Sequence, residues 1–490
     1  MKHRLMITSF IFVCFACNAN TTSNQTDELS PVLPQIGLPF QVTIEQASFQ
    51  LPIGLHSGMV GSYKGQWVFI AGRNNGLHGF PPTPPPDSPP AFPTSGQNIN
   101  ILVVDPKTGQ TFSRSLNDPT AGLTAQQIES LSVTSPQGYQ SSNTLYMTGG
   151  YGYNSSTGSL DTKPILTAIY LPGIVKWVMN PTVGNSVGKN IRQLYNPVFQ
   201  IAGGEMFPLG NLTQLVFGQN FTGYYYDPGT GPGTTGVYSE QVRQFQIVDA
   251  NGQLAVNVYP SRPSNPDPNL HRRDLNIVPV ILDNNANQYG LVAYAGVFYP
   301  YTNPVSPGVW TVPVLIQETG NPIMADPNAA TTFKQAMNQY VGATASLYSK
   351  KDKSNYTIIF GGMSYGYYQN DTFQTDPEIP FLNQVTTIKM DQNGSFTQYL
   401  MDSQYPTILA STLNLTHPSN PLLFGAGAYF IPSNLLQYPN KVISLDAIRK
   451  PTVLGYIVGG IASSLPDTNT PETDSQASPY VFKVTLTPNA

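Results

Sequence analysis

The segment Trp67–Gly72 (WVFIAG) is a run of apolar residues that ends in glycine, and its pattern recurs along the chain. Five later segments repeat it: Leu145–Gly150 (LYMTGG), Leu215–Gly218 (LVFG), Leu291–Gly296 (LVAYAG), Thr357–Gly362 (TIIFGG) and Gly455–Gly460 (GYIVGG). A motif that recurs along a chain indicates a repeat architecture. Glycine at the end of an apolar strand allows close backbone approach and positive φ, as crowded strands near a common axis require.

A second pair of strands is predicted after each glycine-ending segment. The pairs are Ile99–Val104 with Gln110–Leu116, Leu166–Tyr170 with Ile174–Met179, Gln241–Val248 with Leu254–Tyr259, Val309–Gln317 with the residues after Gly320, and Gln384–Met390 with Ser395–Met401. Turns such as Asn251-Gly252 and Asn393-Gly394 between alternating segments are typical of hairpins. The sixth pair has only Tyr480–Thr487, and Gln41–Phe49 is a strand without a partner near the other end.

Pairing these two end strands would complete a ring and remove exposed sheet edges. The prediction is therefore an all-β fold, a six-bladed β-propeller with N- and C-terminal strand closure, forming a single domain over residues 39–490. Insertions are expected at Pro81–Pro93, at Tyr225–Thr235 and at residues 431–452. Short helices are expected at Gln126–Leu131 and Thr331–Gln339.

Residues 1–19 are typical of an export signal. Lys2 and Arg4 precede an apolar stretch that is too short to span a bilayer, and no later segment is apolar and long enough to do so. Cleavage after Ala19 is one interpretation; the other is a lipobox ending at Cys17, which would then carry a lipid anchor. Residues 20–38 are predicted to be a polar linker. The protein is expected to be secreted or to lie at the outer membrane or cell surface as a lipoprotein.

Composition excludes several classes of chemistry. The only cysteines are Cys14 and Cys17, so the rest of the chain offers no thiolate nucleophile, no Cys-ligated metal and no disulfide. The formal net charge is −4, and no basic stripe extends beyond Arg272-Arg273, so nucleic acid is not an expected partner. No phosphate loop or G-x-S-x-G elbow is present, and no cofactor is expected.

The stretch Leu55–Phe80 (LHSGMVGSYKGQWVFIAGRNNGLHGF) resembles the first blade of bacterial secreted kelch-type β-propeller proteins. In that blade a G-x-W strand ending in Gly-Gly-Arg leads into an N-G-L-H turn, and Ala71 here replaces the first glycine of the pair. Gly149-Gly150, Gly361-Gly362 and Gly459-Gly460 match the kelch pattern more loosely. The resemblance implies the fold and export, and it implies no activity.

The loop after the first glycine-ending strand carries candidate ligand contacts. Arg73, Asn74, Asn75 and His78 are placed at the face where propeller loops gather. Arg73 could recognise an anion or a sugar; alternatively, it orders the loop by bonding carbonyls or Asp105. His56 and His78 could converge on a metal with a third ligand, but a structural role bonding loop backbone is favoured, and no metal site is predicted.

Aromatic clusters follow several glycine-ending strands and supply the remaining candidates. The predicted binding tyrosines are Tyr151, Tyr153, Tyr225, Tyr299, Tyr365 and Tyr367. Tyrosine suits carbohydrate or protein surfaces because it offers a large amphipathic contact at low entropic cost. The alternative is that these rings fill gaps between blades.

No catalytic residues are predicted. The favoured function is a binding propeller that recognises an extracellular glycan or protein through its loop-rich axial face. The alternatives are an enzyme acting on an extracellular carbohydrate or peptide at the same face, and a structural envelope protein. The enzyme would require two carboxylates, or a histidine and a carboxylate, within hydrogen-bond reach in the axial funnel.

Overall fold

The computed structural model describes residues 33–34, 37–181, 186–226, 235–250, 252–283, 288–298, 308–468 and 471–489. The predicted signal at residues 1–19, with Cys17, lies outside these residues, as do most of the predicted linker and Tyr299. Among the described residues, no helix combines the length and apolar character needed to cross a bilayer.

The described strands form antiparallel sheets in which one order of four strands recurs. The first such sheet contains β3 (Met59–Tyr63), β4 (Gln66–Ile70), β5 (Asn100–Val104) and β6 (Thr111–Ser115). The second contains β7 (Gln137–Ser141), β8 (Thr144–Thr148), β11 (Ile165–Tyr170) and β12 (Ile191–Tyr195). The third contains β13 (Glu205–Leu209), β14 (Leu212–Val216), β17 (Val242–Ala250) and β18 (Gln253–Arg262).

The same order continues in the second half of the chain. The next sheet contains β19 (Asn276–Asp283), β20 (Gln288–Tyr294), β21 (Val314–Gln317) and β22 (Pro322–Met324). A larger sheet contains β23 (Ala343–Ser349), β24 (Ser354–Met363), β27 (Phe381–Met390) and β28 (Phe396–Gln404). The last contains β29 (Leu423–Pro432), β31 (Thr452–Ser463), β33 (Tyr480–Pro488) and β2 (Phe40–Gln50).

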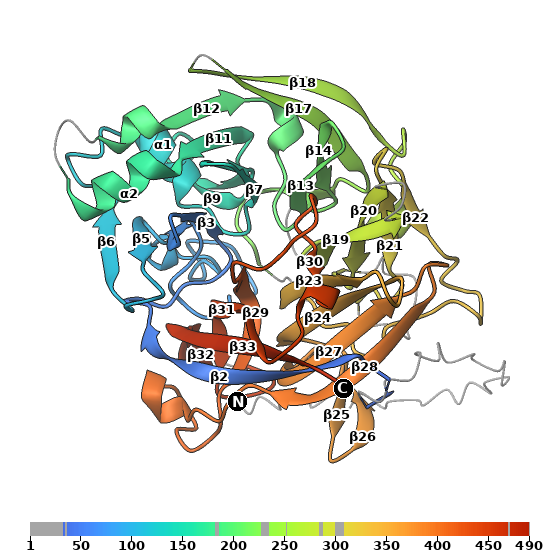
Figure 1. The fold of residues 1–490 in the computed structure, drawn as a ribbon. Coiled ribbons are helices and arrows are strands. Elements are labelled where there is room, and N and C mark those ends of the chain that lie inside the picture. The colour runs from blue at the N-terminus through green and yellow to red at the C-terminus, as the bar shows by residue number, and fades with distance from the viewer. Residues whose placement is uncertain are drawn as a thin grey trace, which may run out of the picture.

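The sheets are arranged around a common centre, with β7, β13 and β29 on the inside and β6, β12, β18 and β22 at the periphery (Figure 1). This all-β arrangement is consistent with a propeller-like fold. All six glycine-ending segments lie in or directly after the second strand of their sheets, as the sequence predicts. The predicted pairing of the chain ends is also confirmed, because β2 pairs antiparallel with β33 and Gln41 lies opposite Thr487.

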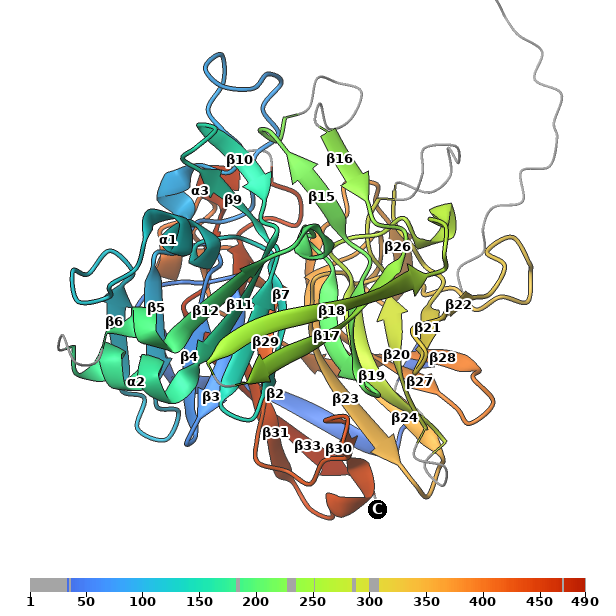
Figure 2. The same cartoon turned by 90° about the horizontal axis from the view of Figure 1, so that it is seen from above.

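Further strands lie outside the recurring groups of four. One further sheet contains β9 (Tyr151–Asn154), β10 (Ser159–Thr162), β15 (Gln219–Thr222) and β16 (Thr235–Tyr238), and its two hairpins lie side by side at the upper edge of Figure 2. A small hairpin joins β25 (Gly366–Gln369) to β26 (Thr372–Thr375). The short strands β1 (Leu33–Pro34) and β30 (Ile443–Ser444) pair in parallel with β28 and β23, respectively, and β32 (Ser475–Ala477) pairs with β31. The inserted segment 431–452 thus reaches the neighbouring sheet through β30.

The described residues contain few helices, and one of them stands where the sequence predicts a strand. The predicted helix at Gln126–Leu131 is confirmed as α1 (Ala125–Leu131), and α3 (Pro471–Asp474) is a single turn. The strand predicted at Ile174–Met179 is wrong, because Leu171–Met179 forms helix α2 and β12 is the actual partner of β11. Pro172 suits the first turn of a helix. Leu171, Ile174, Val175 and Val178 are buried with the i, i+3, i+4, i+7 spacing of one helix face.

The helix predicted at Thr331–Gln339 is also wrong, since the described backbone there is irregular. Its amide side chains are buried and bonded to strands of other segments. Gln335 Oε1 accepts a hydrogen bond from the Ala295 amide at 2.9 Å, and Gln339 Nε2 donates to the Gly361 carbonyl at 2.8 Å. These tertiary bonds override the local helical preference because they satisfy polar groups that water cannot reach.

The second strand of each sheet is largely apolar because both of its faces are buried. In β4, Trp67 and Phe69 pack into one cluster with β29, β31 and β33, whereas Val68 and Ile70 pack into another with β8 and β11. Successive side chains of a strand point to opposite faces of the sheet. A strand between two neighbouring sheets therefore needs a continuous apolar run rather than alternation.

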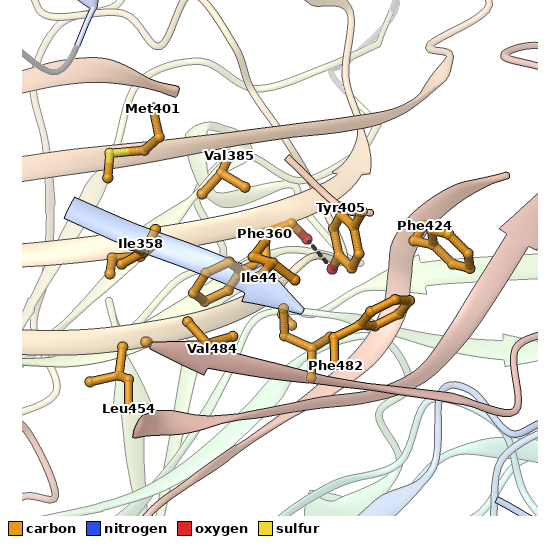
Figure 3. Close-up of a cluster of buried hydrophobic side chains, with 14 of the residues drawn as sticks. Ile44, Ile358, Phe360, Val385, Met401, Tyr405, Phe424, Leu454, Phe482 and Val484 are labelled. Carbon is orange, nitrogen blue, oxygen red and sulfur yellow. Dashed lines mark hydrogen bonds between the residues drawn. The ribbon is translucent and has the colours of Figure 1, made fainter. Parts of the chain in front are cut away.

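We call the six recurring sets of four strands, which begin at β3, β7, β13, β19, β23 and β29, the four-stranded groups. Buried clusters of this kind lie between each four-stranded group and the next. Figure 3 shows one of them, in which Ile358 and Phe360 of β24 face Phe482 and Val484 of β33. The Tyr405 hydroxyl donates a hydrogen bond to the Phe360 carbonyl at 3.2 Å, so the polar atom of this side chain is satisfied within the core. The last group packs on the first through the cluster that contains Trp67.

The end of each second strand has an unusual backbone conformation. Two successive residues there have positive φ: Ala71-Gly72, Gly149-Gly150, Phe217-Gly218, Ala295-Gly296, Gly361-Gly362 and Gly459-Gly460. At Gly149 the reason for glycine is twofold, since φ is +62° and a Cβ atom would overlap the carbonyl oxygen of Ile201, in the segment that leads into β13 of the next sheet. Close approach between neighbouring sheets therefore selects glycine here.

A series of backbone hydrogen bonds joins residues at the innermost strands, five of them just before their strand and one, Gly427, within β29. Val341, Gly427, Ser57, Ser135, Gly203 and Asp274 all have positive φ. The amide of Gly427 donates to the carbonyl of Val341 (2.6 Å), Ser57 to Gly427 (3.0 Å), Ser135 to Ser57 (2.8 Å), Gly203 to Ser135 (3.1 Å) and Asp274 to Gly203 (2.7 Å). We call this series the axial hydrogen-bond chain. It connects equivalent points of all six four-stranded groups.

Replacing Gly149 by alanine should test the close approach between the sheets. We expect Gly149→Ala to lower the free energy of unfolding by about 3 kcal/mol, because the cost of a left-handed alanine, about 1–2 kcal/mol, adds to that of steric overlap. Urea denaturation followed by tryptophan fluorescence measures this. Gly394→Ala is the matched control, since Gly394 has φ +79° and a Cβ atom added there would meet no other atom within 4 Å. Equal losses for the two variants would contradict the overlap argument.

Candidate functional site

A pocket of about 740 Å³ lies where the six four-stranded groups meet. Its lining includes all six residues of the axial hydrogen-bond chain, together with the residues just before them: His56, Thr134, Ala202, Arg273, Tyr340 and Ala426. It also includes the residues that follow the glycine-ending pairs: Arg73, Tyr151, Gln219, Val297, Met363 and Ile461. We call this the axial pocket. Equivalent positions of every repeat contribute to it.

Short backbone bridges hold these lining residues in place. His56 pairs with Arg73, Thr134 with Tyr151, Ala202 with Gln219, Arg273 with Val297 and Tyr340 with Met363, each as an isolated antiparallel bridge. The positive-φ pair before Arg73 and its counterparts turn the chain so that the next residue can form its bridge. The base of the pocket is therefore fixed by backbone geometry, whereas its chemistry is set by side chains that differ between repeats.

Aromatic residues form one wall of the axial pocket. The ring of His78 lies 4.8 Å from the Phe80 ring, 4.6 Å from the Phe92 ring and 5.0 Å from the Tyr225 ring, measured between centroids. Phe221 and Tyr151 extend this wall from the β9–β16 sheet, with centroids 5.1 Å apart. Such edge and tilted contacts between rings are favourable and restrict their orientation.

Arg73 lies in the axial pocket, and its bonds support the loop-ordering alternative. It is 3% exposed, its Nε donates to Asn75 Oδ1 at 2.9 Å, and an Nη donates to the Pro93 carbonyl at 2.8 Å. Its guanidinium also lies 5.3 Å from the Phe92 ring centroid. Asp105 is not among these partners. Arg73 therefore positions Phe92 and the returning end of the proline-rich loop.

The other predicted residues of this loop divide between the pocket and the loop structure. His78 lines the axial pocket. Asn74 and Asn75 are not among the lining residues: Asn74 Nδ2 donates to the Gly54 carbonyl at 2.8 Å, and Asn75 bonds Arg73. These two asparagines order the loop.

The predicted tyrosines are only partly brought together. Tyr151 and Tyr225 line the axial pocket, whereas Tyr153 lines a second, adjoining groove. Tyr365 packs in an apolar cluster with Val297 and Val309, and Tyr367 packs beside Ala336, so neither lines the pocket or the groove. The gap-filling alternative describes these last two. Tyr299 lies outside the described residues.

The two histidines are held as neutral side chains bonded to the backbone. His56 Nε2 lies 2.9 Å from the Asn75 carbonyl, and His78 Nδ1 lies 3.0 Å from the Gly79 carbonyl. Burial lowers the pKa of His56 to about 3 and that of His78 to about 4. Within the described part of the chain, no group of three His, Cys, Asp or Glu side chains is placed to hold a metal ion.

The most polar part of the pocket was not predicted from the sequence. Arg273 and Asp274 lie on one side, and Glu378, Asp467 and Thr468 also line the pocket. Arg273 could have been found by aligning the repeats, because Arg273-Asp274 occupies the position of His56-Ser57 before the innermost strand. No such signal marks Asp467, which lies in a loop beyond β31.

The charges of these groups depend on their surroundings. Burial acts to lower the pKa of the Arg273 guanidinium, but Tyr238 and Asp274 outweigh it and raise that pKa, so Arg273 remains a cation. Its Nε lies 3.6 Å from Asp274 Oδ2. Burial raises the pKa of Asp467, and the nearby carboxylates of Asp376 and Glu378 raise it further.

Three buried polar atoms of the pocket lining lack a hydrogen-bond partner among the described residues: Arg273 Nε, Asp467 Oδ1 and Thr468 Oγ1. Buried polar atoms in native proteins nearly always have a partner in the protein, in water or in a ligand. The residues that line the pocket thus include a donor, an acceptor and a hydroxyl whose hydrogen-bonding capacity is unmet within the described part of the protein.

Comparison with known proteins adds only a distant structural relation. No family model matches the chain, and no curated protein matches it by sequence. A solved structure titled "Structure of YjhT" aligns with 89% of this chain and 98% of its own chain, at 11% identity and a TM-score of 0.44. Similarity at this level supports no inference about function.

Glu205 provides a test of the interior near the axial hydrogen-bond chain. It begins β13, two residues after Gly203, and burial raises its pKa from 4.5 to about 8. The folded state therefore favours the neutral carboxyl, and stability should fall as the pH rises from about 4.5 through about 8. Glu205→Gln should remove this loss, raising the melting temperature relative to the native protein by about 2 °C more at pH 9 than at pH 5. A difference that is the same at both pH values would contradict the assignment.

Proposed function

We propose that this chain is an exported, six-bladed, kelch-like β-propeller that binds a glycan in its axial pocket. The recurrence of one four-stranded order and the pairing of β2 with β33 support the six-bladed count and the closure by the chain ends. The axial hydrogen-bond chain supports a common axis. On this proposal the domain extends over residues 39–490.

The aromatic wall and the unpartnered polar atoms together favour a glycan. A sugar ring has an apolar face of C–H groups that can lie against rings such as Phe80 and Tyr225, and hydroxyls around its edge that both donate and accept hydrogen bonds. Arg273 Nε can donate, Asp467 Oδ1 can accept, and Thr468 Oγ1 can do either. The combination of these three unpartnered atoms with the aromatic wall carries the proposal.

The shape of the site favours a glycan over a protein partner. A concave pocket of about 740 Å³ lies within the range of small-molecule sites, roughly 300–1,000 Å³. Protein interfaces are broader, about 800 Å² on each partner. A purely structural envelope protein would not need a polar pocket at the axis.

An enzyme acting on a carbohydrate at the same pocket is the second candidate. Asp467 favours it, because a carboxyl with a raised pKa next to further carboxylates is a pattern found in glycosidases. Among the described residues, the hydrogen bond between a histidine and a carboxylate joins His271 Nδ1 to Glu240 Oε1 at 2.7 Å, and neither residue lines the pocket. Binding without turnover therefore remains the first proposal.

Export is proposed from the sequence of residues 1–19. The mature protein would be secreted, or would be held at the outer membrane by a lipid on Cys17. The fold needs no disulfide for stability in an oxidising compartment, because packed clusters lie between all neighbouring groups.

Glycan binding should depend on Arg273. We expect the mature protein to bind at least one glycan on an array. Arg273→Ala should lower the affinity for that glycan, measured by calorimetry, at least about tenfold, because a lost charged hydrogen bond costs about 1.5–3 kcal/mol. Arg449→Ala, at an exposed position outside the pocket lining, should leave the affinity unchanged. Asp467→Asn serves as a second pocket variant should Arg273→Ala unfold. Absence of binding to every glycan, or equal affinity for all variants, would overturn the proposal.

Export predicts a shortened N-terminus. Mass spectrometry of the protein recovered from its natural host should show a chain that begins at Cys17 with attached lipid, or at Asn20 without lipid. A mature protein that retains Met1 and residues 2–16 would contradict export.

A further inference from the structure

A second concave surface adjoins the axial pocket. It is a groove of about 460 Å³, and the residues that matter for its chemistry are Phe92, Pro93, Gln97, Tyr153, Leu160 and Tyr224. Phe92 lines both the groove and the axial pocket. We call this surface the aromatic groove.

The boundary between pocket and groove is held rigidly. Arg73 donates to the Pro93 carbonyl and places its guanidinium over the Phe92 ring, and its backbone forms an isolated bridge with Gln97. One residue of the pocket lining thus fixes three residues of the groove. The two concave surfaces therefore keep a constant spacing and can act on one ligand.

The side of the groove away from the axial pocket is formed in part by the β9–β10 hairpin. Tyr153 of β9 lies opposite Leu160 of β10, so their side chains share one face of that pair. The hydroxyl of Tyr224 donates to the Gly158 carbonyl at 3.1 Å, which anchors its ring beside the hairpin turn. Both tyrosines are only partly buried, so part of each ring remains accessible.

The groove also offers polar contacts beside its rings. Gln97 is partly exposed, and no hydrogen bond of its side-chain amide is found among the described residues. An amide can both donate and accept, which suits hydroxyls at the edge of a sugar ring. Aromatic faces next to a free amide repeat the chemistry of the axial pocket on a smaller scale.

We propose that the ligand is an oligosaccharide, with its terminal unit in the axial pocket and the following units in the aromatic groove. This inference rests on the proposed glycan binding and adds the length of the glycan to it. A monosaccharide would contact the pocket alone. Tyr153 and Tyr224 would then contribute only to the binding of longer chains.

The test compares two probes on matched variants. The probes are the array glycan with the strongest signal and the monosaccharide that forms its terminal unit, both titrated by calorimetry. Tyr153→Ala and Tyr224→Ala should each lower the affinity for the oligosaccharide about tenfold, which corresponds to about 1.4 kcal/mol of binding free energy. The affinity of each variant for the monosaccharide should stay within about twofold of that of the native protein. Tyr153→Phe should keep most of the oligosaccharide affinity, because it retains the ring.

Tyr195→Ala is the control, since Tyr195 is 67% exposed on β12 and lines neither surface. The extended site would be overturned if Tyr153→Ala lowered the affinity for both probes equally, or if neither groove variant lowered the affinity for the oligosaccharide. Glycan binding in the axial pocket would stand in either case. Failure of the native protein to bind any array glycan would overturn the proposed function and this inference together.

Discussion

The axial hydrogen-bond chain is the constraint on which the other features depend. Each of its residues takes a left-handed conformation, five of them just before an innermost strand and Gly427 within β29, and each link joins one four-stranded group to the next. Left-handed conformations are costly for residues other than glycine, yet Ser57, Ser135, Asp274 and Val341 adopt them. Packing between the groups and the backbone bonds themselves must offset that cost. The glycine at the end of each second strand then follows from the close approach that these links impose.

In a backbone frame of this kind, the backbone determines where the site lies, and the side chains of individual repeats determine its chemistry. The bridges next to the axial hydrogen-bond chain, and the β29–β31 ladder in the last sheet, place one side chain from each repeat on the pocket wall, whatever that side chain is. Arg73, Tyr151 and Met363 occupy equivalent positions and contribute a cation, a phenol and a thioether. Binding specificity can therefore vary by substitution at these positions without disturbing the frame, as is common where functional residues stand on a rigid scaffold.

The strands could be predicted from the sequence because their pattern reflects burial on both faces, and this holds for β4, β8, β14, β20, β24 and β31. Helix α2 was missed because Ile174–Met179 is apolar enough for either period, and only its packing against the first two sheets selects the helix. The candidate site was predicted in part: Arg73 and Tyr151 directly follow the glycine-ending pairs, and His78 and Tyr225 lie in the loops that come a few residues later, so their place in the repeat locates them. Asp467 and Thr468 lie in a loop whose course depends on tertiary contacts that no local pattern encodes.

Amide hydrogen exchange on the mature protein, resolved to single residues, tests the role of the axial hydrogen-bond chain most directly. If this chain holds the four-stranded groups together, the amides of Ser57, Ser135, Gly203, Asp274 and Gly427 should exchange only through global unfolding, all with the same free energy of opening. Exchange of these amides at the rate of surface-turn amides, or at widely different rates in different groups, would contradict that role and show that the groups are held together by other contacts.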